Sequence, residues 1–374
     1  MSDVLLLVAM MLFLLRENVT DIAPLMRAEK WIAAPACCRL ESMRMYAGID
    51  EAGYGPLLGP MTVACTVWST DEALGPWPDL WKPLASAVCK RPTDRKDRIA
   101  IDDSKTLKGS KEAKTHPLRN LERGVLSMLD AMTRHVRPQE IELFPLKESD
   151  FLKLLGCGPA DALPWHKELP TTLLPIATTG DELRIAANRI RLAFETSGAR
   201  LVWNRCTIIE PEELNQFSKA TGSKSAVSEL ALLRILCELR EKYADAQLCV
   251  ACDRQSGRTR YLKPLQRAFP EAMIRIHEEN DRDSRYQVID GKQNMFISFE
   301  AESEQRHLPV ALASMTAKYV RELSMSRMNA FFANLLPGIA PTAGYVEDGR
   351  RFLEVIRPHL AKWGLDMDRL VRKM

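Results

Sequence analysis

The sequence predicts an α/β protein with a mixed sheet flanked by helices. Two apolar segments, 45–50 and 60–68, are separated by a turn rich in glycine and proline, which is typical of a strand hairpin. A strand, an amphipathic helix and a second strand follow one another within residues 202–253, at the length of a parallel crossover unit. Asp290 and Gly291 occupy the tip of another predicted hairpin. Hairpins and a parallel crossover in one chain together indicate a mixed sheet.

Each element of this sheet has a local signature. The helix expected at 226–242 has apolar residues at the spacing of a helix that faces a core, at 227, 230, 233, 236 and 237. It leads to a strand expected at 248–253, which ends in Asp253. Ligands bind at the carboxyl ends of strands in α/β sheets, so Asp253 is a candidate site residue.

The composition is that of an ordinary globular protein. The 374 residues are 46% hydrophobic and 27% charged, which suits one large core or two smaller ones. A net charge of +3 does not indicate a general polyanion binder, so any such site must be a local patch. Nine cysteines without a convincing secretory signal indicate free thiols in a reducing compartment, and we expect a cytoplasmic location.

Residues 1–44 are expected to be an extension outside the folded domain, which we place at 45–374. The apolar run from 4 to 15 is too short to span a bilayer, and it lacks the basic leader of a signal peptide. Met43 and Met45 directly precede the first expected strand, which favours a poorly ordered extension or an artefact of start-site choice. We expect no membrane partner, and the oligomeric state is left open.

Two adjacent acids, Asp50 and Glu51, lie between the first apolar segment and the glycine-rich turn. Neighbouring side chains on a strand point to opposite faces, so both acids can face one site only if the strand ends or bends there. Gly53 and Gly55 allow such a bend. Carboxylates of this kind suit hard cations such as Mg²⁺ and Mn²⁺. The alternative is a polar turn that follows a core strand.

A run of lysines follows the acidic dipeptide Asp102-Asp103 at three-residue intervals, at 105, 108, 111 and 114. On a helix this repeat would form one basic ridge. Such a ridge is either a solvated helix face or a surface that contacts phosphates.

Five short motifs occur in an order that matches one known family. Residues 50–56, DEAGYGP, are similar to D-E-[AV]-G-R-G-P, and residues 103–107, DSKTL, are similar to D-S-K-K-L. The other three are the apolar run ending at Asp253, residues 310–318 (VALASMTAK), which are similar to S-A-A-S-I-x-A-K, and the late Gly344-Tyr345. The chain therefore resembles the type 2 ribonucleases H, which include ribonucleases HII and HIII.

The resemblance covers about 45–70, 100–110 and 202–355. It fails at about 115–200, where a large insertion contains a helical pattern at 118–136 and an amphipathic helix at 181–196. We expect a lid, a substrate clamp or a partner surface in this insertion.

The resemblance implies a ribonuclease H-like fold with a mixed five-stranded sheet flanked by helices. It implies metal-dependent hydrolysis of the RNA strand of RNA/DNA hybrids, including ribonucleotides embedded in duplex DNA. Asp50, Glu51 and Asp253 would bind Mg²⁺ or Mn²⁺ and act in catalysis with a fourth acid. The substrate-binding residues implied by the family are Gly53, Tyr54 and Gly55 at the ribose 2′-hydroxyl, Ser104 and Lys105 at the backbone, and Tyr345 stacking nearby.

Two glutamates compete for the fourth acidic position. The family places an acid ten residues before the serine that aligns with Ser314, which selects Glu304. Residues 301–303, AES, resemble the family's A-D-S and would select Glu302 after a small insertion. We favour Glu304.

Tyr54 is the main departure from the family, because arginine is usual at this position. Loss of that positive charge predicts weaker binding or an altered substrate preference. Two alternatives follow: a non-catalytic binder of RNA/DNA hybrids whose metal site has decayed, and a related metal-dependent DNA nuclease.

Overall fold

A computed structural model describes residues 43–92, 97–107, 115–136, 143–157, 163–223, 225–255, 257–291 and 293–373. The expected N-terminal extension falls almost wholly outside these residues, as do Lys108, Lys111 and Lys114 of the expected basic ridge. The first strand, β1, begins at Met43, slightly before the expected start at residue 45. All described residues belong to one unit, Leu40–Met374.

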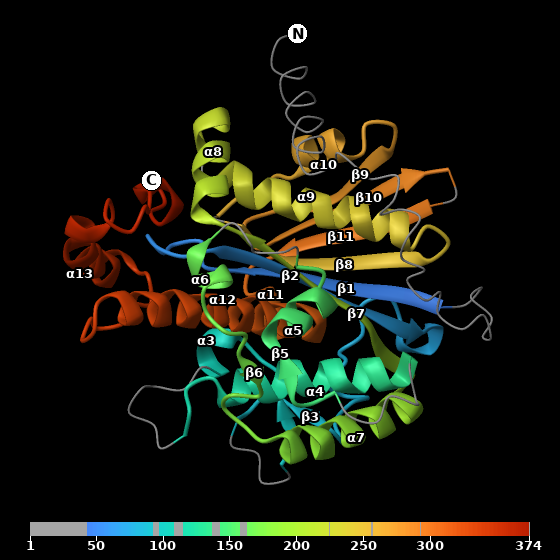
Figure 1. Cartoon of the computed structure of the whole chain (residues 1–374). Coiled ribbons are helices and arrows are strands. Elements are labelled where there is room, and N and C mark those ends of the chain that lie inside the picture. Colours follow the sequence, from blue (N-terminus) through green and yellow to red (C-terminus); the bar gives the residue numbers. More distant parts are fainter. Residues whose placement is uncertain are drawn as a thin grey trace, which may run out of the picture. The chain divides into compact units, whose positions relative to one another are not determined.

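A seven-stranded mixed sheet lies at the centre of this unit, in the order β7-β2-β1-β8-β11-β10-β9 (Figure 1). Its strands are β1 (Met43–Ala52), β2 (Met61–Asp71), β7 (Ala199–Ile209), β8 (Gln247–Asp253), β9 (Met273–Glu279), β10 (Asp283–Asp290) and β11 (Gln293–Glu300). Strand β1 pairs antiparallel with β2 and parallel with β8, and β8 pairs parallel with β11. The predicted α/β class and mixed sheet are confirmed.

The expected count of five strands was wrong. The predicted hairpin at Asp290-Gly291 is present, with β10 and β11 paired from Asp283 opposite Glu300 to Asp290 opposite Gln293. Strand β9 then pairs antiparallel with β10. Because β11 also pairs with β8, the hairpin and β9 extend the central sheet and do not form a separate one.

The predicted crossover connects β7 to β8 through α8 (Pro211–Thr221) and α9 (Ser225–Lys242). These two strands are not neighbours, because β2 and β1 lie between them. They run in the same direction, since β2 is antiparallel to both β7 and β1 and β1 is parallel to β8. The crossover lays α9 over one face of the sheet (Figure 1) and brings the end of β8 beside the end of β1.

The opposite face of the sheet is covered by the long helix α12 (Leu308–Leu335) (Figure 1). Its first turn contacts β1 so closely that a Cβ at Gly48 would lie 2.2 Å from the carbonyl carbon of Pro309. Hydroxyls on β2 join the two elements, with Thr66 Oγ1 donating to the Pro309 carbonyl at 2.7 Å and Thr62 Oγ1 donating to the Ala317 carbonyl at 2.8 Å. These contacts fix the position of α12 along β1.

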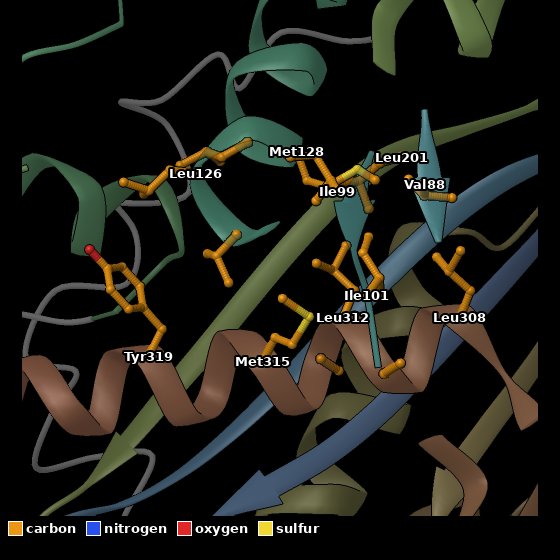
Figure 2. Close-up of a cluster of buried hydrophobic side chains, with 14 of the residues drawn as sticks. Val88, Ile99, Ile101, Leu126, Met128, Leu201, Leu308, Leu312, Met315 and Tyr319 are labelled. Atoms are coloured by element: carbon orange, nitrogen blue, oxygen red, sulfur yellow. The ribbon is translucent and has the colours of Figure 1, made fainter. Parts of the chain in front are cut away.

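The expected insertion packs into the same core. Its two predicted helices are confirmed as α4 (Arg119–Val136) and α7 (Gly180–Ser197). Figure 2 shows Leu126 and Met128 of α4 facing Leu312 and Met315 of α12 across a buried cluster. Short elements complete this region: β5 (Leu146–Lys147), α5 (Glu148–Leu154), α6 (Pro164–Lys167) and β6 (Leu173–Leu174).

Buried polar residues fasten the insertion to α12. Glu122 on α4 is fully buried and accepts hydrogen bonds from the amides of Ile176 and Ala177 and from the Tyr319 hydroxyl. Arg327 on α12 forms a buried ion pair with Glu148, with 3.0 Å between Nη1 and Oε2. A buried ion pair costs desolvation unless it is well hydrogen bonded, and Arg327 also donates to four backbone carbonyls.

The remaining elements are short. They are η2 (Glu72–Leu74), β3 (Val88–Cys89), β4 (Ile99–Ala100), α3 (Ser104–Leu107), α10 (Leu262–Ala268), α11 (Ser303–Arg306), α13 (Val346–Ile356), η3 (Arg357–His359) and η4 (Met367–Arg369). A second apolar cluster packs the end of α12 against α13 and includes Leu58 from the glycine-rich turn. None of the helices among the described residues has the length and apolar character needed to cross a membrane.

Candidate active site

Asp50 and Glu51 lie within β1 and point to opposite faces of the sheet. Strand β1 continues to Ala52, so the expected end or bend at the acids is absent. Asp50 lies within hydrogen-bonding reach of Ser314 on α12. Glu51 accepts a hydrogen bond from Ser228 on α9, and Gln255 Nε2 lies 3.4 Å from the same oxygen. The alternation of a regular strand therefore sends each acid to a different helix.

Asp253 ends β8, the neighbouring strand. Ile49 pairs with Cys252, which puts Asp253 level with Asp50. The Asp253 carboxylate accepts a hydrogen bond of 3.2 Å from the backbone amide of Ser303, the first residue of α11. Asp253 thus lies between the two strand acids and the segment that carries the candidate fourth acid.

Of the two candidate fourth acids, Glu304 is the one placed beside the strand acids. Asp253 interacts electrostatically with Glu304, and so does Asp50. Glu302 is exposed and adopts a left-handed conformation, with φ of 54°, directly before α11. The ungapped count from Ser314 therefore selects the glutamate that faces the cluster.

Burial and mutual repulsion govern the protonation of these acids. Burial, followed by the Asp253 carboxylate, raises the pKa of Asp50 well above its ordinary value. The same two causes raise the pKa of Glu304 to about 7. Burial also raises the pKa of Asp253 and of Glu51, the latter opposed by the hydrogen bond from Ser228. Like charges in a site of low dielectric disfavour full ionisation, so without a cation the cluster retains protons.

The donor chemistry of this cluster fits a hard divalent cation. Carboxylate oxygens are the ligands that Mg²⁺ and Mn²⁺ favour, and a cation would relieve the repulsion that raises these pKa values. Glu304 Oε2 is buried without a hydrogen-bond partner among the described residues. Within the same residues, however, no group of three or more His, Cys, Asp or Glu side chains has the arrangement of a metal site.

Ser104 and Lys105, at the start of α3, lie at the same site. Ser104 is buried, and its Oγ is 3.0 Å from Ser314 Oγ, beside Asp50. Lys105 is exposed, and its charge lowers the pKa values of both Asp253 and Glu304. One lysine of the expected ridge therefore faces the acids, while the other three fall outside the described residues.

The glycine-rich turn follows β1 directly. Gly53 has φ of 85°, and a Cβ there would lie 2.5 Å from Nε of Arg321 on α12, so the position requires glycine. Gly55 is exposed, and no atom lies within 4 Å of the place where its Cβ would stand. Tyr54, between them, is partly buried. The turn thus has a packed inner side at Gly53 and an open outer side at Gly55.

Tyr345 lies beside this turn. The Gly344 carbonyl accepts hydrogen bonds from the amides of Leu57 at 2.7 Å and Leu58 at 3.0 Å. The Tyr345 ring is 52% exposed, and the Arg321 guanidinium lies 5.9 Å from its centroid. Arg321 therefore contacts both Gly53 and Tyr345.

Sequence reasoning missed the residues that hold these groups in place. Ser228 and Gln255 contact Glu51, Ser314 contacts Asp50, and the buried Arg321 and Arg372 lie behind the turn. Ser314 and Arg321 lie on α12 in and near the fourth motif, which was a usable signal. Ser228 and Arg372 have no local signal, because their partners lie 177 and more than 300 residues away in the sequence.

No known family model matches the chain, and no curated protein matches it. The chain is similar to several solved structures. One is the PCNA:RNase HII complex from Archaeoglobus fulgidus, at 17% identity and a TM-score of 0.38 over 88% of this chain and 93% of that chain. Another is Bst-RNase HIII in complex with Mn²⁺, at 16% identity and a TM-score of 0.38 over 89% and 67%.

A third is ribonuclease H2 from Pyrococcus horikoshii OT3, at 13% identity and a TM-score of 0.38 over 87% of this chain and 92% of that chain. At TM-scores below 0.5, these similarities carry no information about the chemistry of the site.

Proposed function

We propose that this protein is a ribonuclease H of the type 2 group with a ribonuclease H-like fold. It would hydrolyse the RNA strand of RNA/DNA hybrids and cut at ribonucleotides embedded in duplex DNA. The observation that carries the proposal is that three carboxylates from separate segments, Asp50, Asp253 and Glu304, come together at one end of the sheet. The glycine-rich turn, which would bind the ribose, follows Asp50 and Glu51 directly and is therefore adjacent to the acidic cluster.

The acids would bind Mg²⁺ or Mn²⁺. When bound, such cations stabilise the attacking and leaving oxygens of a phosphodiester and lower the pKa of water. Asp50 and Asp253 would supply oxygens from adjacent strands, and Glu51 would supply its carboxylate from the opposite face of β1. Glu304 would complete the set of acids and help to place the second ion or the water.

The remaining predicted residues would bind and orient the nucleic acid. Lys105 is exposed beside the acids and would contact a phosphate of the strand being cut. The main chain at Gly53, Tyr54 and Gly55 would contact the ribose 2′-hydroxyl, and the open outer side at Gly55 leaves room for it. The exposed ring of Tyr345 would stack against the sugar or base beside that ribose.

The described cysteines suit a reducing compartment such as the cytoplasm. None of the seven described cysteines forms a disulfide, and six of them are buried: Cys65, Cys89, Cys157, Cys206, Cys249 and Cys252 are buried and Cys237 is partly exposed. A cytoplasmic location is therefore part of the proposal.

A cleavage assay on a DNA duplex with one ribonucleotide, with Mg²⁺ or Mn²⁺, tests the proposal. We expect incision at the ribonucleotide and no incision of the same duplex made wholly of DNA. Binding of the ribonucleotide duplex without incision would indicate a non-catalytic hybrid binder. Equal cutting of both duplexes would indicate a DNA nuclease.

A further inference from the structure

Two buried arginines lie behind the glycine-rich turn. Arg321 on α12 is 1% exposed and Arg372, after η4, is 2% exposed. Each is far from the other in sequence, and both contact the same turn. Arg321 packs against Gly53, and Arg372 hydrogen bonds to the turn's main chain.

Arg372 binds the turn at both ends. Its Nε and Nη2 donate to the Gly59 carbonyl at 2.8 and 2.6 Å, and its Nη1 donates to the Gly53 carbonyl. Its backbone amide donates to the Leu57 carbonyl at 3.0 Å. The guanidinium therefore binds two carbonyls of the turn, and the backbone amide of the same residue binds a third. A rigid planar guanidinium can bridge the two carbonyls, whereas a lysine ammonium cannot reproduce the same fork.

The segment that carries Arg372 is itself held in place. Asn215 on α8 donates to the carbonyls of Asp368 at 3.1 Å and Val371 at 2.8 Å, and its Oδ1 accepts from the Lys373 amide at 2.7 Å. Val371 also forms an isolated antiparallel bridge with Leu58. The turn is thus fastened to α8 through residues 368–373.

This arrangement is costly for a residue with only a packing role. Burial, followed by the charge of Arg321, lowers the pKa of Arg372 to about 9, and Glu210 acts in the opposite direction. Both guanidiniums hydrogen bond to backbone carbonyls, Arg321 to that of Ala343 and Arg372 to those of Gly53 and Gly59. Apolar residues could fill the same volume without burying two like charges. The benefit must then come from the geometry that the guanidinium gives to the turn.

We propose that Arg372 is a positioning residue for ribose recognition. By binding the carbonyls of Gly53 and Gly59 on the inner side, it holds the main chain of residues 53–55 in one conformation toward the substrate. The inference rests on the proposed function. It also explains how the turn could still recognise the ribose with tyrosine at position 54, because the main chain and not the side chain would make the contact.

The test compares Arg372→Gln and Arg372→Lys with Lys373→Ala as the matched control. Lys373 is the adjacent residue, and its hydrogen bond to Asn215 uses the backbone. Its exposed ammonium forms a surface ion pair with Asp368, at 2.6 Å, and contacts no residue of the turn in that pair. Each change is made in a D50N background, so that binding is measured without cleavage. Fluorescence anisotropy then gives the affinity for a duplex with one ribonucleotide and for the all-DNA duplex. We expect R372Q and R372K to reduce the affinity ratio about tenfold, and K373A to leave it unchanged.

Hydrogen exchange provides the readout that is independent of nucleic acid. In R372Q, the amides of residues 53–59 should exchange faster, while those in the middle of β1 and β2 should not change. Faster exchange with an unchanged affinity ratio would show that Arg372 is only structural and would overturn the inference. Unchanged exchange at 53–59 would also overturn it. If the D50N parent itself does not distinguish the two duplexes, the proposed function fails whatever Arg372 does.

Discussion

The acidic cluster and the glycine-rich turn are adjacent in sequence but are held in place in different ways. Asp50, Glu51 and Asp253 lie on two paired strands, and regular backbone hydrogen bonds set their positions. The turn has no regular pairing of its own beyond the Leu58 bridge, and Arg372, Arg321 and Gly344 hold it through long-range contacts. Changes at the acids should therefore alter chemistry with little effect on structure, while changes behind the turn should alter recognition.

The largest expected effect comes from neutralising a strand acid. We expect D50N or D253N to reduce hydrolysis by at least about a hundredfold, because each removes an oxygen that would bind a cation. The same changes should keep or raise the melting temperature of the metal-free protein, since they relieve repulsion. Steady-state cleavage and calorimetry check both parts. Near-normal turnover in either variant would show that the acids are not the active site.

The next largest effect should separate the two candidate fourth acids. E304Q should lower activity by roughly 10- to 100-fold, whereas E302Q should change it little, because Glu302 is exposed and outside the cluster. A cleavage assay on the two variants provides the comparison. A greater loss in E302Q would move the fourth acid to that residue.

The pH dependence of stability provides a control for Glu304. Its pKa is raised to about 7 in the folded protein, so the folded state binds more protons than the unfolded state between about pH 4.5 and 7. Stability of the metal-free protein should therefore fall as pH rises through this range, and E304Q should flatten the decrease. Urea unfolding at pH 5 and pH 8 measures this. If the free energy of unfolding changes equally with pH in the wild type and in E304Q, Glu304 does not bind the extra proton of the folded state.

A smaller effect is expected from Ser228, which bonds Glu51 without being part of the cluster. Ser228→Ala removes a hydrogen bond to Glu51 and should lower activity about tenfold. Conservative rescue by Ser228→Thr, which keeps the hydroxyl, would support a positioning role. If S228A retains full activity, contacts other than the Ser228 hydrogen bond orient Glu51.

The smallest effect on cleavage is expected at Tyr54. Tyr54→Arg should keep or strengthen hybrid binding and make the slope of log affinity against log salt more negative by about 0.9, because one added phosphate contact releases one more counterion. Discrimination between ribonucleotide and all-DNA duplexes should hardly change, since the main chain is proposed to read the ribose. An unchanged slope would show that residue 54 does not face a phosphate. Loss of discrimination between ribonucleotide and all-DNA duplexes would show that the tyrosine ring itself recognises the ribose.

Much of the fold follows from local patterns in the sequence. The strands at β1, β2, β7 and β8, the helices α4, α7 and α9 and the hairpin at Asp290-Gly291 are present close to their predicted bounds. Hydrophobic periodicity and turn residues are local, so they appear in the sequence itself. The number of strands in the sheet is not local, because β9 joins it only through pairing with β10.

The sequence by itself determined which acids are available and where the glycine turn falls relative to them. Only the tertiary structure decided that Asp50 and Glu51 face α12 and α9 on opposite sides, that Glu304 rather than Glu302 joins Asp253, and that Arg372 lies behind Gly53. The physical reason is the separation along the sequence between the residues that interact. Strand alternation and turn chemistry act between neighbouring residues, whereas these placements depend on contacts between segments tens to hundreds of residues apart.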